Sequence, residues 1–482
     1  MTSTKIKLSQ GVVRGCREEL PNGKSFLRFS GIPYAKPPIN ELRFKSPQKL
    51  LKFEEDEIDC TKERDACFHR STITKKHVGS EDCLNLNVYV PENRKSSEKF
   101  AVMVYIHGGG LKYDSNSRQL YSPEFLVMEN VIIVTMNYRL HVLGFLYMPS
   151  KGIPGNAGMK DQQMALEWVY ENISSFNGDP KKICLFGESS DLYENSDKVL
   201  SEQEEDQGVR YIWRTVIEPE SDEAMITKSA TDSIIDQTGQ INIPMMFGTL
   251  NGDGMPSIAK VLSRNKLDLM NKLPYLFVPR KIGNLSDNEM KAFAKEIKQF
   301  YLNGKDLSIE TLKDLVRLRT DVDYRFAIMR TSELYARYQP EVKQFLFEFR
   351  FDGRLNLQKK QMRLDHLPFA GHADDVFHLF GGELVDRVNL EKDSREWKMR
   401  ETMCKLWTNF AKYDDPTPDY NNPLPFKWTS IAPITNKTQD ISLNHLIIDD
   451  EMMMVENPHK ESMEFWKKAY RKWNKEFIQA KL

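Results

Sequence analysis

The chain has 482 residues, and its 68 Lys and Arg nearly balance its 69 Asp and Glu, so the formal net charge at pH 7 is -1. This balance gives no basic surface for a phosphate backbone and excludes nucleic acid as an expected partner. The longest apolar runs, residues 101–106 and 131–134, are far shorter than the ~18 residues that a membrane-spanning helix requires. We therefore expect no membrane span.

The two ends of the sequence and its cysteines bear on where the protein resides. The N-terminus lacks an apolar segment behind a basic start, so we expect a protein that is not exported and is cytoplasmic. The terminal Ala480-Lys481-Leu482 is similar to the Ser-Lys-Leu peroxisomal signal, which makes the peroxisome the alternative. Six widely spaced cysteines without CxxC pairs are predicted to be buried free thiols.

The first third of the chain is predicted to be rich in strands. Residues 5–29 flank the turn Pro21-Asn22-Gly23 and predict an antiparallel meander. Residues 31–44 contain three prolines and predict a loop without helix. Residues 80–90 alternate apolar and polar side chains, as a half-buried strand does.

Buried strands and helices then alternate. Residues 101–106 and 131–136 are continuously apolar, which is typical of strands covered on both faces. Residues 158–172 show helical spacing, and residues 183–186 are the next strand. The alternation predicts an α/β fold with a mostly parallel central sheet wrapped by helices.

The pattern breaks at residues 191–208, which carry little apolar surface at helical spacing and are predicted to be solvated. It returns in the second half of the chain. We expect strands at residues 241–254 and 342–351 and helices at residues 287–302, 324–338 and 462–477. The aromatic face of the last helix is interpreted as core and not as a cofactor site.

Ser189 is the candidate nucleophile. It follows the apolar strand at residues 183–186 in the turn Gly187-Glu188-Ser189, and such a strand-to-turn serine carries its hydroxyl above the edge of an α/β-hydrolase sheet. The turn usually closes with a second small residue, whereas this chain has Asp191 there. Since a β-carbon at this place collides with the bend, Asp191 marks a departure from the pattern.

Several long motifs resemble the type-B carboxylesterase and cholinesterase family, with the insect alpha-esterase branch as the nearest likeness. They are residues 31–48, Ser80-Glu-Asp-Cys-Leu84, Tyr105-Ile-His-Gly-Gly-Gly110, Asn137-Tyr-Arg-Leu140, Gly155-Asn-Ala-Gly-Met-Lys-Asp-Gln162 and Phe186-Gly-Glu-Ser-Ser190. The resemblance implies a single α/β-hydrolase domain over residues 1–482 that cleaves small-molecule carboxylic esters through an acyl-serine intermediate. It implies no cofactor and no metal site.

The family's roles fall on particular residues of this chain. The resemblance assigns Ser189 as nucleophile, His372 in Phe369-Ala-Gly-His-Ala-Asp-Asp375 as base, and Asp253 in Asn251-Gly-Asp-Gly254 as the acid. Such chemistry needs a base, a group that orients it, and N–H donors for the oxyanion. The donors would be the backbone N–H groups of Gly109, Gly110 and Ser190.

Some assignments have competitors or structural alternatives. Asp374 and Asp375 are close to His372 in sequence and compete with Asp253 for the role of the acid. Three other residues are given structural roles: His107 is expected to fix the glycine-run backbone, and Arg43 and Glu81 are expected to form an ion pair.

The resemblance also implies a loss. The family has a helix after the nucleophile and then another parallel strand, and neither is found here, so residues 191–240 are atypical and an internal deletion is placed directly after Ser190. The strand that begins near Ile241 must then pair with residues 183–186 or leave backbone groups unsatisfied. Two hypotheses follow: an active ester hydrolase, or a catalytically inactive truncated homologue that is a binding protein or a non-functional isoform.

Overall fold

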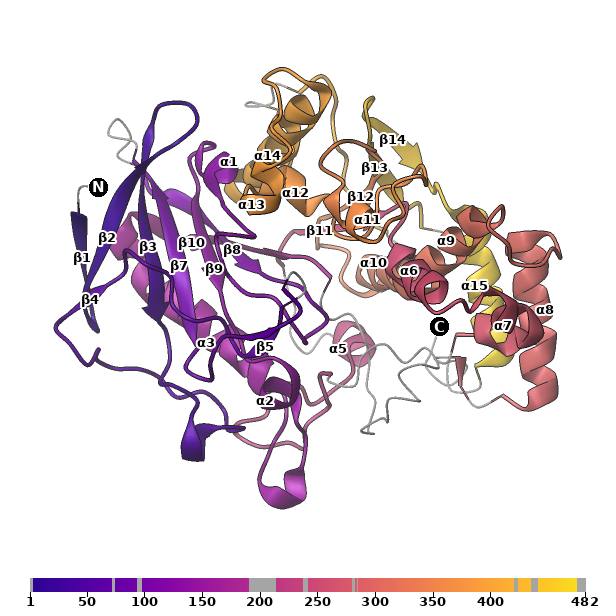
Figure 1. Ribbon diagram of the computed structural model, residues 1–482, viewed down its shortest axis with the longest axis horizontal. Helices are drawn as coiled ribbons and strands as arrows, with labels where there is room; N and C mark the ends of the chain where they lie inside the picture. The colour runs from indigo at the N-terminus through magenta and orange to yellow at the C-terminus, as the bar shows by residue number, and fades with distance from the viewer. Residues whose placement is uncertain are drawn as a thin grey trace. The chain divides into compact units, whose positions relative to one another are not determined.

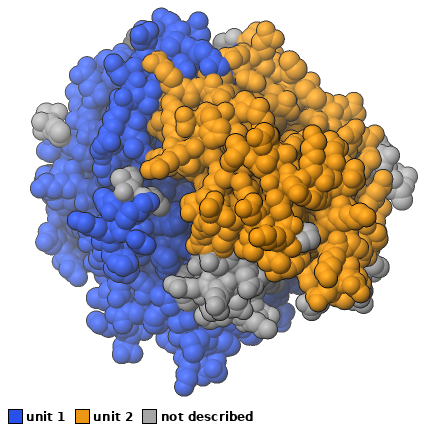
Figure 2. Space-filling view, turned by 45° about the vertical axis from the view of Figure 1, so that its right-hand side comes forward, with its two compact units in different colours: residues 1–199, 211–229, 376–424 blue, residues 200–210, 230–375, 425–482 orange. Residues whose placement is uncertain are grey.

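The computed structural model describes residues 3–71, 74–92, 98–189, 214–236, 242–279, 282–283, 285–419, 424–434 and 441–474. The chain divides into two compact units, coloured blue and orange in Figure 2. Unit 1 comprises residues 1–199, 211–229 and 376–424, and unit 2 comprises residues 200–210, 230–375 and 425–482. Each unit has its own sheet and its own cluster of buried apolar side chains.

The sheet of unit 1 is mixed (Figure 1). Its strands, in spatial order, are β1 (Ser3–Leu8), β2 (Gly11–Glu19), β3 (Ser25–Pro33), β7 (Asn85–Pro91), β9 (Ile132–Met136), β8 (Phe100–Ile106) and β10 (Gly178–Gly187), with β4 (Glu57–Asp59) beside β2. β9, β8 and β10 are parallel, whereas β1, β2, β3 and β7 form antiparallel pairs, which confirms the meander. The parallel strands are the ones predicted from continuous apolar runs.

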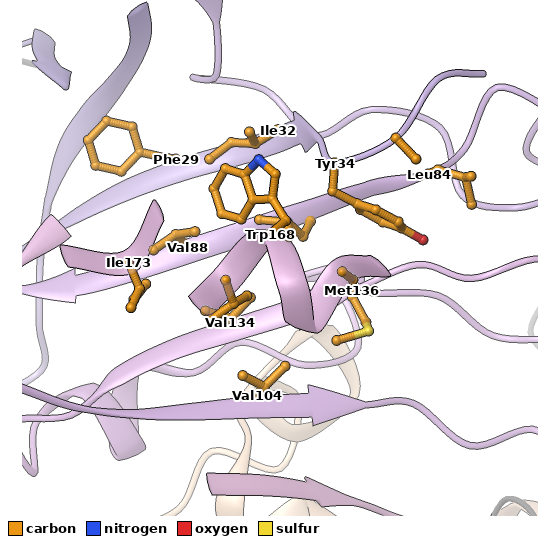
Figure 3. Close-up of a cluster of buried hydrophobic side chains, with 14 of the residues drawn as sticks. Phe29, Ile32, Tyr34, Leu84, Val88, Val104, Val134, Met136, Trp168 and Ile173 are labelled. Atoms are coloured by element: carbon orange, nitrogen blue, oxygen red, sulfur yellow. The ribbon is translucent and has the colours of Figure 1, made fainter. Parts of the chain in front are cut away.

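Helices cover both faces of this sheet. The helices of unit 1 are α1 (Glu124–Val127), α2 (His141–Phe145), α3 (Ala157–Asn172), α12 (Val376–Leu379), α13 (Glu383–Asp386) and α14 (Arg395–Tyr413), with short turns η1 (Asn40–Leu42), η2 (Pro149–Lys151) and η3 (Ile173–Phe176). Trp168 of α3 and Ile173 pack on Val104 and Val134 of the sheet, in a cluster that Figure 3 shows. Tyr105 is the neighbour of Val104 in β8 and points to the opposite face, because side chains alternate along a strand. The predicted loop at residues 31–44 contains one short helical turn, η1.

The expectation of a half-buried strand at residues 80–90 was wrong. Every residue of β7 is buried, including the polar Asn85 and Asn87. Asn87 accepts a hydrogen bond from the Gly31 N–H at 2.8 Å, and its amide donates to the carbonyl of Asn116 at 3.0 Å. The polar positions of the alternation therefore belong to a buried hydrogen-bond network and not to a solvent face.

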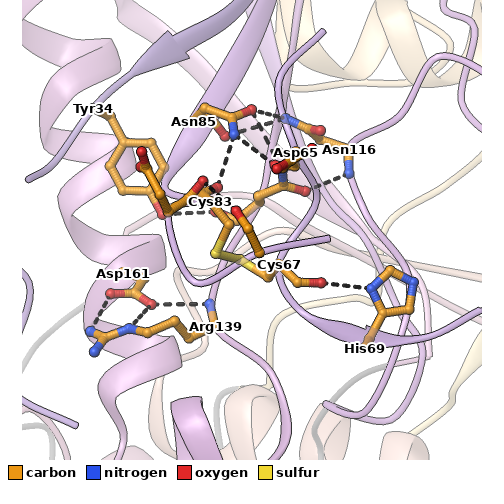
Figure 4. The surroundings of a disulfide bond; sticks show 12 residues. Tyr34, Asp65, Cys67, His69, Cys83, Asn85, Asn116, Arg139 and Asp161 are labelled. Carbon is orange, nitrogen blue, oxygen red and sulfur yellow. Dashed lines mark hydrogen bonds and ion pairs between the residues drawn. A yellow bond between two sulfur atoms is a disulfide. The ribbon is translucent and has the colours of Figure 1, made fainter. Parts of the chain in front are cut away.

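The expectation that all six cysteines are free was also wrong. Cys67 and Cys83 form a disulfide, with their Cα atoms 4.8 Å apart (Figure 4), whereas the other four are free. Sequence spacing could not reveal this pair, because the bond depends on the fold of the chain between the two cysteines, where the short strands β5 (His69–Arg70) and β6 (His77–Val78) pair with each other. The cytoplasmic location expected from the sequence, with the peroxisome as its alternative, stays a prediction.

Unit 2 is built on a four-stranded sheet. Its strands are β11 (Met245–Leu250), β12 (Gln344–Phe349), β13 (Asn444–Ile448) and β14 (Met453–Glu456), of which the first three are parallel. The helices are α5 (Ala230–Ile235), α6 (Met255–Ser263), α7 (Leu267–Lys272), α8 (Asp287–Leu302), α9 (Leu312–Thr320), α10 (Phe326–Tyr338), α11 (Leu357–Gln361) and α15 (Lys460–Trp473), with the short turn η4 (Pro274–Phe277) and the π-helical turn η6 (Asp321–Arg325). Trp466 of α15 is buried against Phe293 of α8, so the aromatic face of α15 is core, as predicted.

The strands on either side of the inferred deletion end their respective sheets. Among the described strands, β10 pairs only with β8 and β11 pairs only with β12, so direct pairing of β10 with β11 is not formed. Leu185 in β10 is 50% exposed. Residues 191–208 and Ile241, on which two of the predictions fall, lie outside the described residues. No helix in the described part of the chain is long and apolar enough to cross a membrane.

Candidate active site

Ser189 lies in a strained turn at the end of β10. Its φ is +64°, in the left-handed region that costs a residue with a β-carbon about 1 kcal/mol or more. Gly187 makes the turn possible, since a β-carbon there would lie 2.6 Å from the carbonyl oxygen of Ile106. This is the strand-to-turn conformation that the sequence predicted for a nucleophile elbow.

The glycine run after β8 approaches this turn. A β-carbon on Gly108 would lie 2.6 Å from the carbonyl oxygen of Glu188 and 3.1 Å from Cβ of Ser189, so only glycine permits the approach. Gly109 and Gly110 have φ of +98° and +59°. The structure thus places Gly108, the first glycine of the run, against Ser189 within unit 1. The predicted oxyanion glycines Gly109 and Gly110 follow it directly, and Ser190 lies outside the described residues.

His107 holds the backbone of the glycine run, as expected. Its ring stacks on Tyr138 with centroids 4.5 Å apart, and its Nδ1 lies 3.0 Å from the carbonyl oxygen of Gly108. The Tyr138 hydroxyl donates to the carbonyl of His107 at 2.8 Å. Burial lowers the pKa of His107 and so favours its neutral form, and its ring is engaged by Tyr138 and the Gly108 backbone in a structural role.

Aromatic side chains pack around Phe186 near the end of β10. Phe186, two residues before the bend of Glu188, stacks on Phe380 at 5.9 Å and contacts Tyr105 at 5.1 Å. Tyr105 and Phe380 are themselves 4.7 Å apart. Three mutually packed rings fix the strand that presents Ser189.

His372 and Asp253 form a hydrogen-bonded pair in unit 2. His372 Nδ1 lies 2.9 Å from Asp253 Oδ1, and the side chains are 15% and 4% exposed. Asp253 Oδ2 accepts the backbone N–H of Leu250 at 2.7 Å, which fixes the carboxylate. A buried carboxylate on Nδ1 leaves Nε2 as the ring nitrogen that can take up a proton from a nucleophile.

The competing carboxyl Asp374 contacts the backbone of its own loop. Its Oδ2 accepts the N–H of Gly371 at 2.7 Å and its Oδ1 accepts the N–H of Gln358 at 2.8 Å. Asp374 therefore shapes the histidine loop, and Asp253 is the carboxylate found on the imidazole.

Backbone contacts tie the loops of Asp253 and His372 together. Gly252 forms a parallel bridge with Gly371, and its N–H donates to the carbonyl of Ala370 at 2.9 Å. The Asn251 side chain accepts the N–H of Ala370 at 2.8 Å. Sequence reasoning missed this role of Asn251, although an Asn in a glycine-rich turn is a recognisable backbone partner.

A second missed residue is Tyr324, in the π-helical turn η6. Its ring lies against the imidazole of His372, with centroids 4.7 Å apart and planes inclined by 42°. No local sequence signal indicates this contact, because Tyr324 and His372 are distant in the chain.

Ion pairs brace the loops of unit 1. Arg43 Nε lies 2.5 Å from Glu81 Oε2, which confirms the predicted pair. The buried Arg139 and Asp161 form another pair, visible in Figure 4, that the sequence did not reveal.

The segment that follows the inferred deletion packs on unit 1 through Asn156: the Val216 N–H donates to Asn156 Oδ1 at 2.8 Å. Asn156 belongs to the motif of residues 155–162, so this motif holds the returning chain.

Ser189 and its glycine run belong to unit 1, and the His372–Asp253 pair belongs to unit 2. Within the described ranges, no group of three or more His, Cys, Asp or Glu side chains has the arrangement of a metal site. A strained serine beside a glycine turn and an imidazole oriented by a buried carboxylate are the components of acyl transfer.

Comparisons with known proteins find esterases that are similar to this chain. Esterase B1 of Culex pipiens is 26% identical over 98% of this chain and 98% of its own length, and a juvenile hormone esterase of Tribolium castaneum is 28% identical over 90% and 88%. The crystal structure of juvenile hormone esterase from Manduca sexta, with OTFP covalently attached, matches with a TM-score of 0.80 at 23% identity, over 98% of this chain and 100% of that one. The fold is therefore that of an α/β-hydrolase.

The family match also bears on the inferred deletion. The alignment with Esterase B1 is 544 residues long although this chain has 482, so the relative fills positions that this chain lacks. The model of the carboxylesterase family matches residues 2–190 and 192–466, and its two segments meet at Asp191, where the sequence predicts the join. With nearly its whole length matched, this chain belongs to the carboxylesterase family, whose members are serine hydrolases.

Proposed function

We propose that this protein hydrolyses small-molecule carboxylic esters through an acyl-serine intermediate. Ser189 is the nucleophile, His372 the general base and Asp253 the carboxylate that orients it. The observation that carries the proposal is the 2.9 Å contact between His372 Nδ1 and the buried Asp253, held by the bridge between their loops.

The reaction would run in two halves. His372 Nε2 takes the proton of the Ser189 hydroxyl as Oγ attacks the ester carbonyl carbon, and the N–H groups of Gly109, Gly110 and Ser190 stabilise the oxyanion. The imidazolium then gives its proton to the departing alkoxide, which leaves an acyl-serine. Water, deprotonated by the same imidazole, attacks the acyl carbon and releases the acid and the free serine.

Cleavage of p-nitrophenyl butyrate tests this proposal. We expect the wild type to release nitrophenolate faster than buffer does and Ser189→Ala to abolish that excess. Asp375→Asn serves as the control, since the proposal gives that nearby carboxyl no part in the reaction, and it should retain the rate. Equal rates for wild type and Ser189→Ala would overturn the proposal.

The second candidate is a catalytically inactive homologue, and the interruption of the family match at Asp191 favours it. A helix that begins after the nucleophile directs N–H groups and its positive dipole end at the oxyanion. Losing one oxyanion donor costs about 2.7 to 4 kcal/mol of transition-state stabilisation. Under this alternative the wild type and Ser189→Ala both match the buffer rate.

A further inference from the structure

The π-helical turn η6 and the residue before it contact His372 and the loop that carries Asp253. All of these residues lie within unit 2. The Phe326 N–H bonds to the carbonyl of Asp321, five residues back, so a single π turn separates α9 from α10. Such turns are rare because their hydrogen bonding is less favourable than that of an α-helix, and they are retained where they place a particular side chain.

One face of this turn meets the acid loop and the histidine. Thr320 and Tyr324 are four residues apart and so lie on the same side of the helical segment. Thr320 Oγ1 accepts the N–H of Gly254, the residue after Asp253, at 2.9 Å, while the ring of Tyr324 lies 4.7 Å from that of His372. Thr320 and the turn that follows it thus contact the residue after Asp253 and the ring of His372.

A neighbouring side of the turn is fastened to α6, the helix that follows Asp253. Arg319 binds Asp323 through two hydrogen bonds of 3.1 and 2.7 Å, and the Ser257 hydroxyl donates to the same carboxylate at 3.2 Å. Because Ser257 lies four residues beyond Asp253, this contact holds the π turn and the acid loop in one arrangement.

The remaining side of the turn is fixed in the interior. Asp321 and Arg325 form a buried ion pair, and the Tyr301 hydroxyl donates to Asp321 Oδ2 at 2.8 Å. Tyr301 in turn accepts a hydrogen bond from the indole of Trp466 at 2.7 Å. With Asp321 held by both Arg325 and Tyr301, this side of the turn gives a firm support for the ring of Tyr324.

From these contacts we infer that Tyr324 is a positioning residue for His372. The π turn holds the Tyr324 ring against the imidazole. The Tyr324 ring keeps the imidazole plane oriented toward Asp253 and excludes water from the hydrogen bond between His372 Nδ1 and Asp253 Oδ1. The catalytic consequence rests on the proposed function, whereas the effect on the hydrogen bond does not. Aromatic pairs in such inclined contacts contribute about 0.5 to 1.5 kcal/mol beyond burial, enough to select one orientation.

The test compares Tyr324→Leu with Tyr324→Phe, which keeps the ring. Tyr335→Leu is the matched control, because Tyr335 is a half-buried tyrosine of α10 in the same helical segment without a ring contact to His372 among the described residues. The first readout is the downfield proton NMR signal of the His372 Nδ1–H, assigned by its loss in Asp253→Asn. The second is kcat and KM for p-nitrophenyl butyrate.

We expect Tyr324→Leu to broaden or lose the Nδ1–H signal by exchange with water, and Tyr324→Phe and Tyr335→Leu to retain it. The kcat of Tyr324→Leu should fall by about 10- to 100-fold with KM within a factor of about two, as misplacement of a catalytic group predicts. Tyr324→Met replaces the leucine variant if that variant does not fold.

Retention of the signal in Tyr324→Leu, or an equal loss in Tyr335→Leu, would overturn the inference. The NMR readout does not depend on turnover, so a chain that cleaves no ester but loses the signal in Tyr324→Leu alone contradicts the proposed function and supports the positioning role.

Discussion

His445 on β13 links the pH of the solution to the stability of unit 2. It is 2% exposed, and its Nδ1 lies 2.9 Å from the carbonyl oxygen of Leu443. Burial lowers the pKa of His445 to about 4, whereas the unfolded chain takes up this proton near pH ~6.5. The folded pKa is below the unfolded one, so the stability contributed by the neutral ring is present above about pH 6.5 and lost as the pH falls toward 4.

Replacing His445 should therefore flatten the loss of stability in acid. Between pH 7.5 and 5, urea unfolding of the wild type should show up to about 2 kcal/mol more loss than unfolding of His445→Asn. His366→Asn, at an exposed histidine, should keep the wild-type slope. Equal slopes for wild type and His445→Asn would show that the buried imidazole does not supply this pH dependence.

At the residue scale, a local motif could predict a site residue where that residue lies in a recognisable turn. Ser189 follows a strand and a glycine and could be named from these neighbours, whereas Asp253 and His372 were assigned by the family resemblance. The Cys67–Cys83 bond and the Tyr324 ring on His372 could not be predicted, because each depends on the path of the intervening chain.

At the scale of elements, the missing segment affects the burial of a side chain in β10. Leu185 is paired in register with Val104 of β8, so both side chains lie on the same face of the sheet. Val104 is fully buried under α3, whereas Leu185 is 50% exposed. Loss of the helix that follows the nucleophile in the family accounts for a strand whose apolar side chain has lost its cover.

The same substitution at these two positions should give opposite results. Leu185→Glu should change the free energy of unfolding by about 0.5 kcal/mol or less and reduce aggregation, as a charge on an exposed edge strand does. Val104→Glu buries an unpaired carboxylate and should cost more than about 4 kcal/mol or prevent folding. Urea unfolding checks both, and a large loss in Leu185→Glu would mean that Leu185 is covered.

Some elements could be predicted to the residue and others could not. The helix at residues 287–302 was placed correctly, and its start carries a capping box in which Ser286 and Glu289 bond to each other's backbone. The strand β7 was misjudged because Asn85 and Asn87 are polar yet buried, and periodicity alone cannot separate a polar network from a solvent face. The helix predicted at residues 324–338 includes the last two residues of the π turn, because the spacing of apolar residues over so short a stretch does not separate a π turn from an α-helix.

At the scale of the whole molecule, the two compact units make cooperative unfolding testable. Each has its own sheet and apolar cluster, and the single domain over residues 1–482 remains a prediction from the family resemblance. We expect differential scanning calorimetry to give a calorimetric enthalpy larger than the van't Hoff enthalpy, as for units that unfold separately. One transition with equal enthalpies would favour a single cooperative domain.

If this chain carries out the proposed ester hydrolysis, Ser189 is an activated serine. An activated serine reacts covalently with an organophosphate, whereas an ordinary serine does not, because only the former has a base beside it and donors for the developing charge. Mass spectrometry of the protein after exposure to paraoxon measures this directly. We expect one phosphoryl adduct on the peptide that contains Ser189 and none on Ser189→Ala. An unlabelled wild type, or equal labelling of both proteins, would show that Ser189 is not an activated nucleophile.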